Sequence, residues 1–419
     1  MIYFFNNFNN IIINLFFLLL FFVFIFILFI IFLSLYFTKK LLKDKKYSVY
    51  YTIKDGLNKG EFGEELLSSP KIHFFFKKNK SKKIYGQIFI GDFDKIIFFY
   101  HGVTWTLYGM YKYILPFIKN NWTCILIDSK AHGLTYGDFP SYGFYEKYDF
   151  KCIVDYFISI FTKLILKGQG IKNEERKIEA NKGNRIINEF SFKNFKKFKI
   201  FKNFYKYFEK DLFIDNINEV KFLDLILKEY KNINLNENKE DIEEKNENAK
   251  EKKILFGLFG ESMGAAIVSQ TVDILENKPD FVILNSTFSS LSILSKNILL
   301  NTIKNKFISN FVYIFSRIFI KILARFDIED VNPIEYILKI DLPVMLIHSK
   351  NDPLIPFDMA YEIYKRKLEK MKIFEKEKIE KKKIFLEIFD CNEHAREIYS
   401  DEEKYWDSIF SFISIYYKS

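Results

Sequence analysis

Cysteine is scarce in this sequence. Three cysteines, Cys124, Cys152 and Cys391, stand far apart among 419 residues, and no two form a C-x-x-C pair. An odd number at such spacing argues against a disulfide framework and against a zinc site. We therefore expect each of the three to be a small, buried, apolar residue.

Concentrated charge of one sign is also missing. The 63 Lys and Arg residues are spread among 53 Asp and Glu residues, which gives a formal net charge of +10 without a compact basic domain. No nucleic-acid-binding module is visible, so we expect no nucleic-acid partner. Apolar residues, by contrast, make up 49% of the chain. That is enough to bury a full core, and it excludes disorder of the whole chain.

One long run has no charge at all. Residues 11–37 are 27 residues with only Asn14 and Ser34 as clear polar breaks. About 20 apolar residues suffice to span a bilayer. A cleaved signal peptide would need a basic start, a shorter apolar stretch and a small-residue cleavage site, and none is visible. We expect residues 1–38 to form a retained transmembrane anchor.

The charges around this run predict its orientation. Five lysines follow it within residues 39–46, whereas residues 1–10 carry no Lys or Arg. By the positive-inside rule, the chain crosses the membrane once and its long C-terminal part lies on the cytoplasmic side. The sequence gives no indication of oligomeric state.

Beyond the anchor, short apolar runs alternate with helical stretches. This alternation predicts an α/β fold with a mostly parallel sheet covered by helices on both faces. The expected organisation is a juxtamembrane linker at 39–69, a first core part at 70–166, a Lys-, Asn- and Glu-rich insertion at 167–253 and a second core part at 254–419.

Two segments allow more than one interpretation. Residues 191–208 place six phenylalanines at a spacing of mostly three, with lysines between them. They form an extra helix packed on the domain, or reflect biased composition, or form a basic aromatic helix lying on a membrane. Residues 291–326 form either a helical cap or helices packed on the core.

The run ILFGLFGESMGAA, residues 254–266, passes from a strand-like pattern through a tight turn into helix formers. This is the sequence form of a nucleophile elbow, in which a strained turn projects a serine hydroxyl, here of Ser262, from the sheet edge. The positions two before and two after the serine approach neighbouring backbone closely. Gly260 and Gly264 meet that requirement.

A serine hydroxyl needs a base within hydrogen-bond reach, and the base needs an acid to orient it. In an elbow architecture the chain order is serine, acid, histidine. Asp352 follows a strand-like run in LPVMLIHSKNDPLIP, and His394 follows another in IFLEIFDCNEHA. Asp390 and Glu393 are rival acids, but they share the loop of His394, so we prefer Asp352.

The other four histidines are assigned structural roles. We expect His73 to be a strand residue and His101 to shape the turn after its strand. His132 and His348 precede turn residues, so we expect them to bond backbone groups there.

Stabilising an oxyanion requires two positioned donors. In this architecture they are the backbone N–H of the residue after the nucleophile and an N–H from the turn after the first long strand. In this sequence they are the amides of Met263 and Val103.

Six motifs occur in order along the chain: HGVT at 101–104, IDSKAHGLTYG at 127–137, YEKYDFKCIVDYF at 145–157, GESMGAA at 260–266, NDPLIP at 351–356 and NEHA at 392–395. Together they resemble the α/β hydrolases, and within them the serine aminopeptidase-like and Bem-type membrane-linked branch. The resemblance implies the α/β-hydrolase fold. It also implies hydrolysis of an ester, thioester or amide through an acyl-enzyme, with Ser262, Asp352 and His394 as triad and without metal or organic cofactor.

The sequence departs from the family in two places. The usual Arg-Gly-His-Gly-x-Ser is Lys-Ala-His-Gly-Leu-Thr at 130–135, and the insertion at 167–253 is not at the common place for a lid. Two other functions stay open, an acyltransferase using the same triad and a non-catalytic membrane-tethered scaffold. The substrate is not readable, although the anchor suggests a small-molecule or lipid-like acyl compound.

Overall fold

The computed structural model describes residues 2–43, 46–79, 81–170, 212–214, 254–374 and 383–416. The predictions for the 191–208 helix and for most of the 167–253 insertion lie outside these ranges. The chain divides into two compact units. The smaller comprises residues 1–44 with 291–331, and the larger comprises 45–290 with 332–419.

The larger unit is built on a mostly parallel sheet, as predicted. Nine described strands form it in the order β5-β1-β2-β4-β3-β6-β7-β8-β9. Only β2 runs against its neighbours β1 and β4, and the other pairs are parallel. The strands are β1 (Ile72–Lys77), β2 (Lys83–Phe89), β3 (Asp92–Tyr100), β4 (Trp122–Ile127), β5 (Leu212–Ile214), β6 (Leu255–Glu261), β7 (Phe281–Asn285), β8 (Val344–Ser349) and β9 (Ile384–Phe389).

The central strands are buried along their whole length. Every residue of β4, β6, β7 and β8 is buried, because helices cover both faces of the sheet. This explains why these strands read as continuous apolar runs rather than as alternating patterns. The predicted insertion adds the short strand β5, which pairs in parallel with β1.

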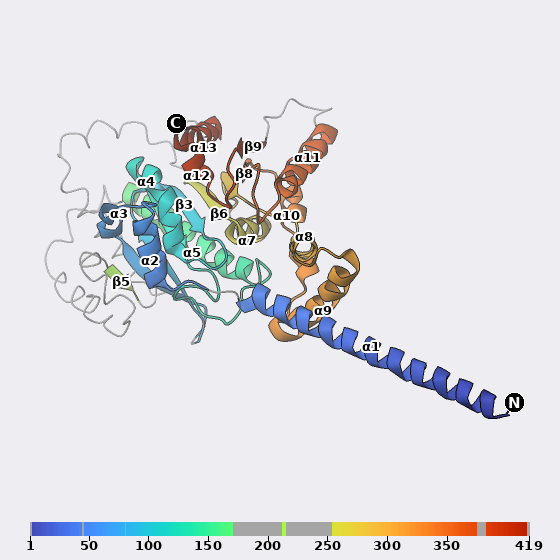
Figure 1. Ribbon diagram of the computed structural model, residues 1–419. Helices are drawn as coiled ribbons and strands as arrows, with labels where there is room; N and C mark the ends of the chain where they lie inside the picture. Colours follow the sequence, from blue (N-terminus) through green and yellow to red (C-terminus); the bar gives the residue numbers. More distant parts are fainter. Residues whose placement is uncertain are drawn as a thin grey trace. The chain divides into compact units, whose positions relative to one another are not determined.

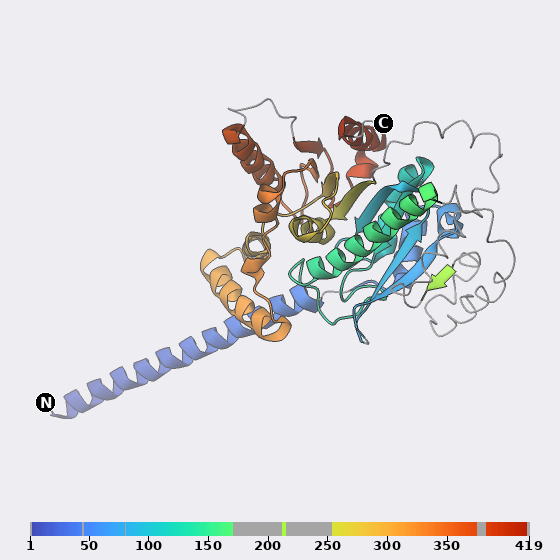
Figure 2. The same ribbon diagram turned by 180° about the vertical axis from the view of Figure 1, so that it is seen from behind.

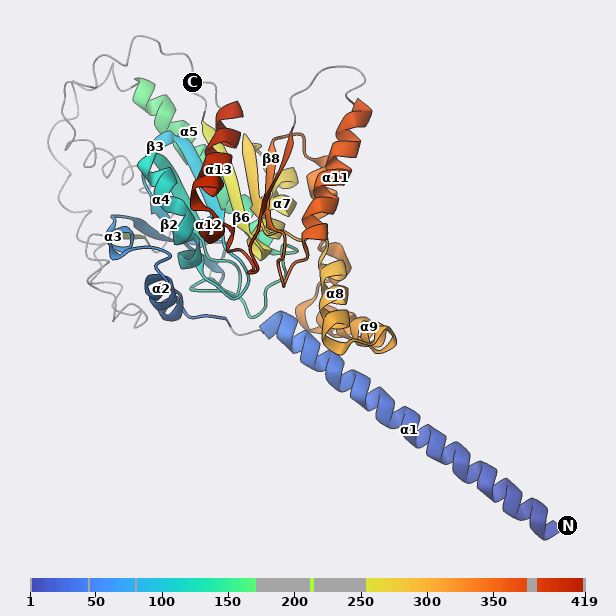
Figure 3. The same ribbon diagram turned by 45° about the horizontal axis from the view of Figure 1, so that its top comes forward.

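One face of the sheet carries α4 (Tyr111–Lys119), α12 (Glu397–Ser400) and α13 (Glu402–Tyr416), which lie in front of the strands in Figure 3. The other face carries α5 (Glu146–Gly170) and α7 (Met263–Thr271), and Figure 2 shows α5 crossing that face. On the α7 side lie also α10 (Pro333–Lys339) and α11 (Phe357–Phe374). Helices on both faces of a mostly parallel sheet, with an elbow between β6 and α7, constitute the α/β-hydrolase fold.

Two sequence predictions need correction here. The stretch 39–69, expected to be a linker, contains α2 (Val49–Asn58) and α3 (Glu64–Ser68), and its residues Ile53 and Leu67 are fully buried in the hydrophobic core. The apolar residues of these two helices are separated by polar and charged residues in the sequence, so the apolar pattern did not predict the helices. Of the cysteines, Cys124 is buried as predicted, but Cys152 and Cys391 are only partly buried.

The smaller unit is helical. It contains α1 (Ile2–Lys43), α8 (Leu291–Ile303), α9 (Lys306–Ala324) and a short 3-10 turn at Ile328–Asp330. Figure 1 shows α9 lying beside the C-terminal part of α1. By length and composition, Ile13–Leu42 and Lys306–Ala324 could each cross a membrane. The predicted cap range 291–326 corresponds to α8 and α9, and its role as a cap stays a prediction.

Candidate active site

Ser262 lies in a strained turn between β6 and α7. Its backbone angles are φ 54° and ψ −118°, a conformation that residues with a side chain rarely adopt. A Cβ atom on Gly264 would lie 2.0 Å from the carbonyl oxygen of Tyr100, and one on Gly260 would lie 2.5 Å from Cα of Ala265. The two glycines therefore stand where only backbone fits, as the sequence predicted.

Three predicted side chains meet at this turn. His394 Nε2 lies 2.8 Å from Ser262 Oγ, and His394 Nδ1 lies 2.7 Å from Asp352 Oδ2. Ser262 and Asp352 are buried, and the His394 side chain is 19% exposed, which leaves one edge of the ring open. The array has the connectivity of a nucleophile, a base and an orienting acid.

Asp352 is held by the turn that follows β8. Its Oδ1 accepts hydrogen bonds from the backbone N–H groups of Leu354 (2.8 Å) and Ile355 (2.9 Å), so Oδ2 is left to face His394. Burial raises the pKa of this carboxyl, but the hydrogen bond and charge of His394 together with the two backbone N–H groups outweigh burial and lower the pKa below its ordinary value. The carboxylate is therefore ionised at neutral pH.

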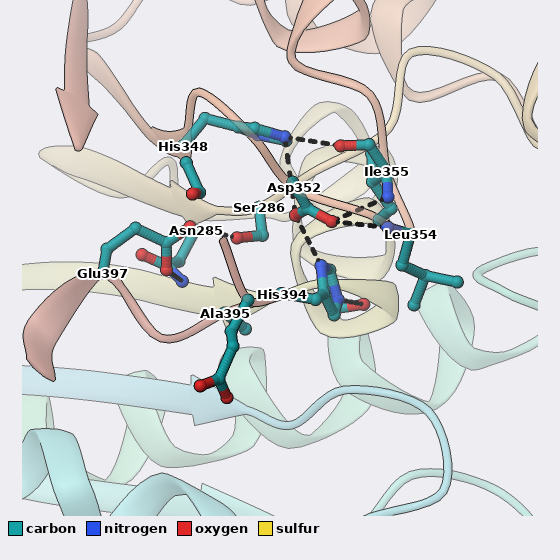
Figure 4. Close-up of polar contacts among 12 residues, drawn as sticks. Asn285, Ser286, His348, Asp352, Leu354, Ile355, His394, Ala395 and Glu397 are labelled. Carbon is teal, nitrogen blue, oxygen red and sulfur yellow. Dashed lines mark hydrogen bonds and ion pairs between the residues drawn. The ribbon is translucent and has the colours of Figure 1, made fainter. Parts of the chain in front are cut away.

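His348 supports the same turn. Its Nε2–H donates to the carbonyl oxygen of Ile355 at 2.9 Å, and its ring lies 3.7 Å from Asp352 Oδ2 (Figure 4). Burial lowers the pKa of His348, so the ring is neutral near pH 7 and adds no charge beside Asp352. The prediction that His348 bonds backbone at a turn is confirmed.

The rival acids lie elsewhere on the loop. Asp390 accepts a hydrogen bond from the Asn351 amide at 3.2 Å in an exposed position. The Glu393 side chain is 75% exposed and lies 3.9 Å from Arg396. Asp352, and neither rival, is the carboxylate in contact with the imidazole.

The turn after β3 runs beside the elbow. A Cβ atom on Gly102 would lie 3.3 Å from Cβ of Ser262, so the predicted oxyanion donor Val103 follows a residue at which a side chain would crowd the nucleophile. Met263 is the first residue of α7, and the first N–H groups of a helix have no acceptor within it. Both predicted donors thus belong to backbone that flanks Ser262.

Two buried histidines fix that turn. His101 Nδ1–H donates to the Gly102 carbonyl oxygen at 2.7 Å, and its Nε2 accepts from the Ser129 N–H at 2.9 Å. His132 Nε2 accepts from the Thr104 N–H at 3.2 Å. Burial lowers the pKa of His101 to about 3 and that of His132 to about 4, so both are neutral when they hold the backbone. The structural roles predicted for them are confirmed.

His73 is buried on β1, where its Nδ1 lies 2.5 Å from the hydroxyl of Tyr85. It is a strand residue with a polar partner, as predicted. No set of three or more His, Cys, Asp or Glu side chains that could hold a metal ion occurs in the described ranges of the chain.

Sequence reasoning missed a buried ion pair next to the elbow. Lys112 Nζ lies 2.6 Å from Glu261 Oε2 and donates to the carbonyl oxygen of Ala395 at 3.2 Å. Glu261 precedes Ser262, and Ala395 follows His394, so one ammonium group ties the nucleophile turn to the histidine loop. The Tyr113 hydroxyl also donates to Glu261, at 2.6 Å. Nothing in the local sequence around Lys112 indicates this contact, because its partners are more than 140 residues away.

A second missed acid lies behind the histidine loop. Glu397 is 1% exposed and accepts hydrogen bonds from Asn285 Nδ2 (3.1 Å) and Ser286 Oγ (2.6 Å). Figure 4 shows these three side chains grouped apart from the Asp352–His394 pair. Glu397 therefore ties the histidine loop to the end of β7. Its hydrogen bonds go to Asn285 and Ser286, whereas the carboxylate that bonds His394 is that of Asp352.

Comparisons with known proteins add little beyond this geometry. No protein-family model matches the chain. A 63-residue stretch is 36% identical to the uncharacterized protein YqkD of Bacillus subtilis (strain 168), and it covers 15% of this chain and 21% of that protein.

Among solved structures, an esterase of Pyrococcus furiosus is 16% identical with a TM-score of 0.48, covering 84% of this chain and 94% of its own. An acylaminoacyl peptidase of Pyrococcus horikoshii is 12% identical with a TM-score of 0.40, covering 83% of this chain and 42% of its own. A thioesterase domain from the curacin biosynthetic pathway is 10% identical with a TM-score of 0.37, covering 81% and 98%. These values are too low to carry an activity over to this chain.

Proposed function

We propose that this chain is a serine hydrolase held at a membrane by α1, and that it cleaves an ester, thioester or amide through an acyl-enzyme. The observation that carries the proposal is the unbroken hydrogen-bonded array from Ser262 through His394 to Asp352, with the serine on a strained elbow. A scaffold without activity has no need of such strain, which costs about 1–3 kcal/mol.

In the first half of the reaction, Ser262 Oγ attacks the substrate carbonyl carbon while His394 Nε2 takes the hydroxyl proton. The imidazolium that forms is stabilised by Asp352, whose carboxylate faces Nδ1–H. Negative charge develops on the carbonyl oxygen, and the amides of Met263 and Val103 stabilise it. His394 then returns its proton to the leaving group, and the acyl group stays on Ser262.

In the second half, His394 removes a proton from water, and the resulting nucleophile attacks the acyl-enzyme. The product acid leaves, and Ser262 regains its proton. An alcohol acceptor in place of water would make the same machinery an acyltransferase. The substrate that we propose is a small-molecule or lipid-like acyl compound, because the anchor would hold the enzyme beside the bilayer. The five lysines within residues 39–46 favour the cytoplasmic side for the catalytic part.

The test is labelling of the full-length protein in detergent with a fluorophosphonate probe, which reacts with an activated serine. Wild type is expected to label, whereas Ser262→Ala is expected not to label. Ser269→Ala, which changes another buried serine on α7, serves as the matched control and is expected to label like wild type. A folded wild type that does not label would overturn the proposal.

A second measurement separates hydrolase from acyltransferase. Chromogenic acyl esters of increasing chain length are offered with and without a primary alcohol, and the products are identified. Free acid as the main product in both mixtures supports a hydrolase. A transferred ester as the main product when the alcohol is dilute would identify a transferase instead.

A further inference from the structure

The helix α9 exposes a line of large apolar side chains. We name Phe307, Phe311, Ile314, Ile318 and Ile322 the outer stripe; they are 63%, 37%, 51%, 46% and 67% exposed. Their spacing of three or four residues puts them on one face of the helix. A contiguous apolar face of this kind marks an interaction surface.

The opposite face of α9 is buried and partly polar. Ser316 Oγ donates to the Ser34 carbonyl oxygen of α1 at 3.1 Å. Thr38 Oγ1 donates to the Ser316 carbonyl oxygen at 3.4 Å, and Ser34 lies 3.3 Å from the Val312 carbonyl oxygen. This seam of small polar residues between helices is typical of packing in membranes, where it lets backbones approach closely. The buried face of α9 thus includes Ser309 and Ser316, whereas Phe307, Phe311 and three isoleucines are exposed, which is unusual for a helix in water.

The helix that α9 packs against is itself apolar on its outer surface. Large apolar side chains of α1 are exposed from Ile13 to Phe29, while Ser34 and Thr38 in the seam are buried. The outer stripe therefore belongs to a helix that packs on an apolar helix, and a bilayer would cover the exposed apolar side chains of both. The sequence of α9 contains no acid, but two of its three cations, Arg317 and Lys321, pair with Asp327 beyond the end of the helix. Lys306 is exposed at the start of the helix, from which it can reach toward anionic head groups.

The position of the seam decides how α9 meets the membrane. The middle of α9 contacts α1 at Ser34 and Thr38, and Lys39 and Lys40 follow within about one helical turn. If α9 also crossed the bilayer, its middle would lie at the bilayer centre and would draw these two lysines into hydrocarbon, which is costly. A helix lying in the plane of the interface avoids that cost.

We propose that α9 is a second membrane contact, lying in the interface beside the end of α1 with the outer stripe inserted among the acyl chains. The proposal rests on the anchoring by α1 proposed above and does not depend on hydrolase activity. An interfacial helix of this kind inserts about 5–10 Å deep.

The experiment uses the full-length protein in vesicles of phosphatidylcholine with phosphatidylglycerol. Cys152 and Cys391 are replaced by serine, and buried Cys124 is kept. An environment-sensitive fluorophore is then placed by one of three substitutions: Ile314→Cys in the outer stripe, Phe24→Cys on exposed α1, or Lys365→Cys, whose side chain is 63% exposed on α11. Quenching is measured with nitroxide lipids labelled at two depths and with iodide in water.

We expect shallow nitroxide to quench position 314 several-fold more strongly than position 365, and iodide to do the reverse. Labels at Phe307→Cys and Ile322→Cys should give the same shallow depth as 314. Adding Phe311→Glu with Ile318→Glu, both on exposed positions, should abolish lipid quenching at 314 without unfolding the protein.

Four results would overturn the inference, and the last of them concerns the anchor. Lipid quenching at 24 but iodide quenching at 314 would leave the anchor standing and refute the contact of α9. Deeper quenching at 314 than at 307 and 322 would mean that α9 spans the bilayer. Protection of 314 from both quenchers, dependent on protein density, would identify a second copy of the chain as the partner. Absence of lipid quenching at 24 would refute the anchoring, and the inference with it.

Discussion

The two units of this protein distribute polar and apolar side chains in opposite ways. Around Ser262 in the larger unit, acids and histidines are buried and each carries hydrogen bonds to backbone or to another side chain. In the smaller unit, serines form the buried seam and phenylalanine and isoleucine form the outer surface. A core surrounded by water needs every buried charge to be paired, whereas a helix pair in lipid needs only its backbone and a few hydroxyls satisfied.

This contrast predicts that single polar substitutions have large effects in the site and small effects in the seam. The largest is expected for Asp352→Asn, which keeps the Oδ1 contacts to Leu354 and Ile355 but presents an amide to His394 and favours the wrong imidazole tautomer. The kcat/KM for a chromogenic ester should fall about 10⁴-fold. Asp390→Asn, on the exposed end of the histidine loop, is the control and should keep activity within a few-fold. Equal losses in the two variants would remove Asp352 from its proposed role.

The second largest effect is expected for Lys112→Met, on the free energy of unfolding. The substitution leaves Glu261 buried beside the elbow without its cation and removes the hydrogen bond to the Ala395 carbonyl, so we expect a loss of about 4 kcal/mol in unfolding free energy. Lys95→Met breaks the exposed pair with Asp92 at 3.3 Å and should cost under about 1 kcal/mol.

Because Lys112 acts through the residues that it holds, its variants should also lower kcat more than they raise KM. Lys112→Arg should restore part of kcat, since a guanidinium can reach both acceptors. Denaturant unfolding and steady-state kinetics measure both effects. A Lys112→Met protein as stable as wild type would show that the buried pair contributes nothing.

The third effect, a smaller loss of unfolding free energy, is expected where backbone segments pack closely at the elbow. Gly264→Ala adds a methyl group 2.0 Å from the Tyr100 carbonyl oxygen, so β3 and the elbow must separate, at a cost of about 3 kcal/mol. Gly60, unlike Gly264, stands at a positive φ of 66°, but a Cβ atom there would have no atom within 4 Å, so Gly60→Ala should cost about 1 kcal/mol. Thermal unfolding compares the two variants. A smaller shift in Tm for Gly264→Ala than for Gly60→Ala would contradict the close packing at the elbow.

The smallest effect is expected in the seam. Ser316→Ala removes one hydrogen bond between α9 and α1, and such bonds contribute about 0.6 kcal/mol in membrane proteins. Thr302→Ala removes an exposed hydroxyl that bonds only within α8 and serves as the control. Unfolding by sodium dodecyl sulfate in mixed micelles provides the measurement. A loss of stability in Ser316→Ala as large as that in Lys112→Met would mean that polar groups are as costly to remove from the seam as from the site.

Much of the fold was readable from the sequence because the relevant signals are local. Continuous apolar runs predicted the central strands, and GESMG predicted a strained turn, since only glycine fits at two of its positions. The order of Ser262, Asp352 and His394 predicted which side chains would meet. The core helices α2 and α3 were missed because their apolar residues are few and separated by charges.

Contacts between distant segments were not readable. The pair of Lys112 with Glu261 joins residues 149 apart, and Glu397 reaches Asn285 and Ser286 across 112 and 111 residues. A lysine on an amphipathic helix carries no local sign of being buried.

By itself the sequence determined the central strands, the elbow and the long apolar helix α1, because glycine positions and uninterrupted apolar length act within a few residues of each other. Only the tertiary structure decided that Lys112 bridges two loops, that Glu397 reaches the end of β7, and that α9 turns Phe307 and Phe311 outward. Those outcomes depend on which surfaces the folded chain brings together. Buried polar groups must then be paired, and apolar side chains that stay at the surface are available to a bilayer.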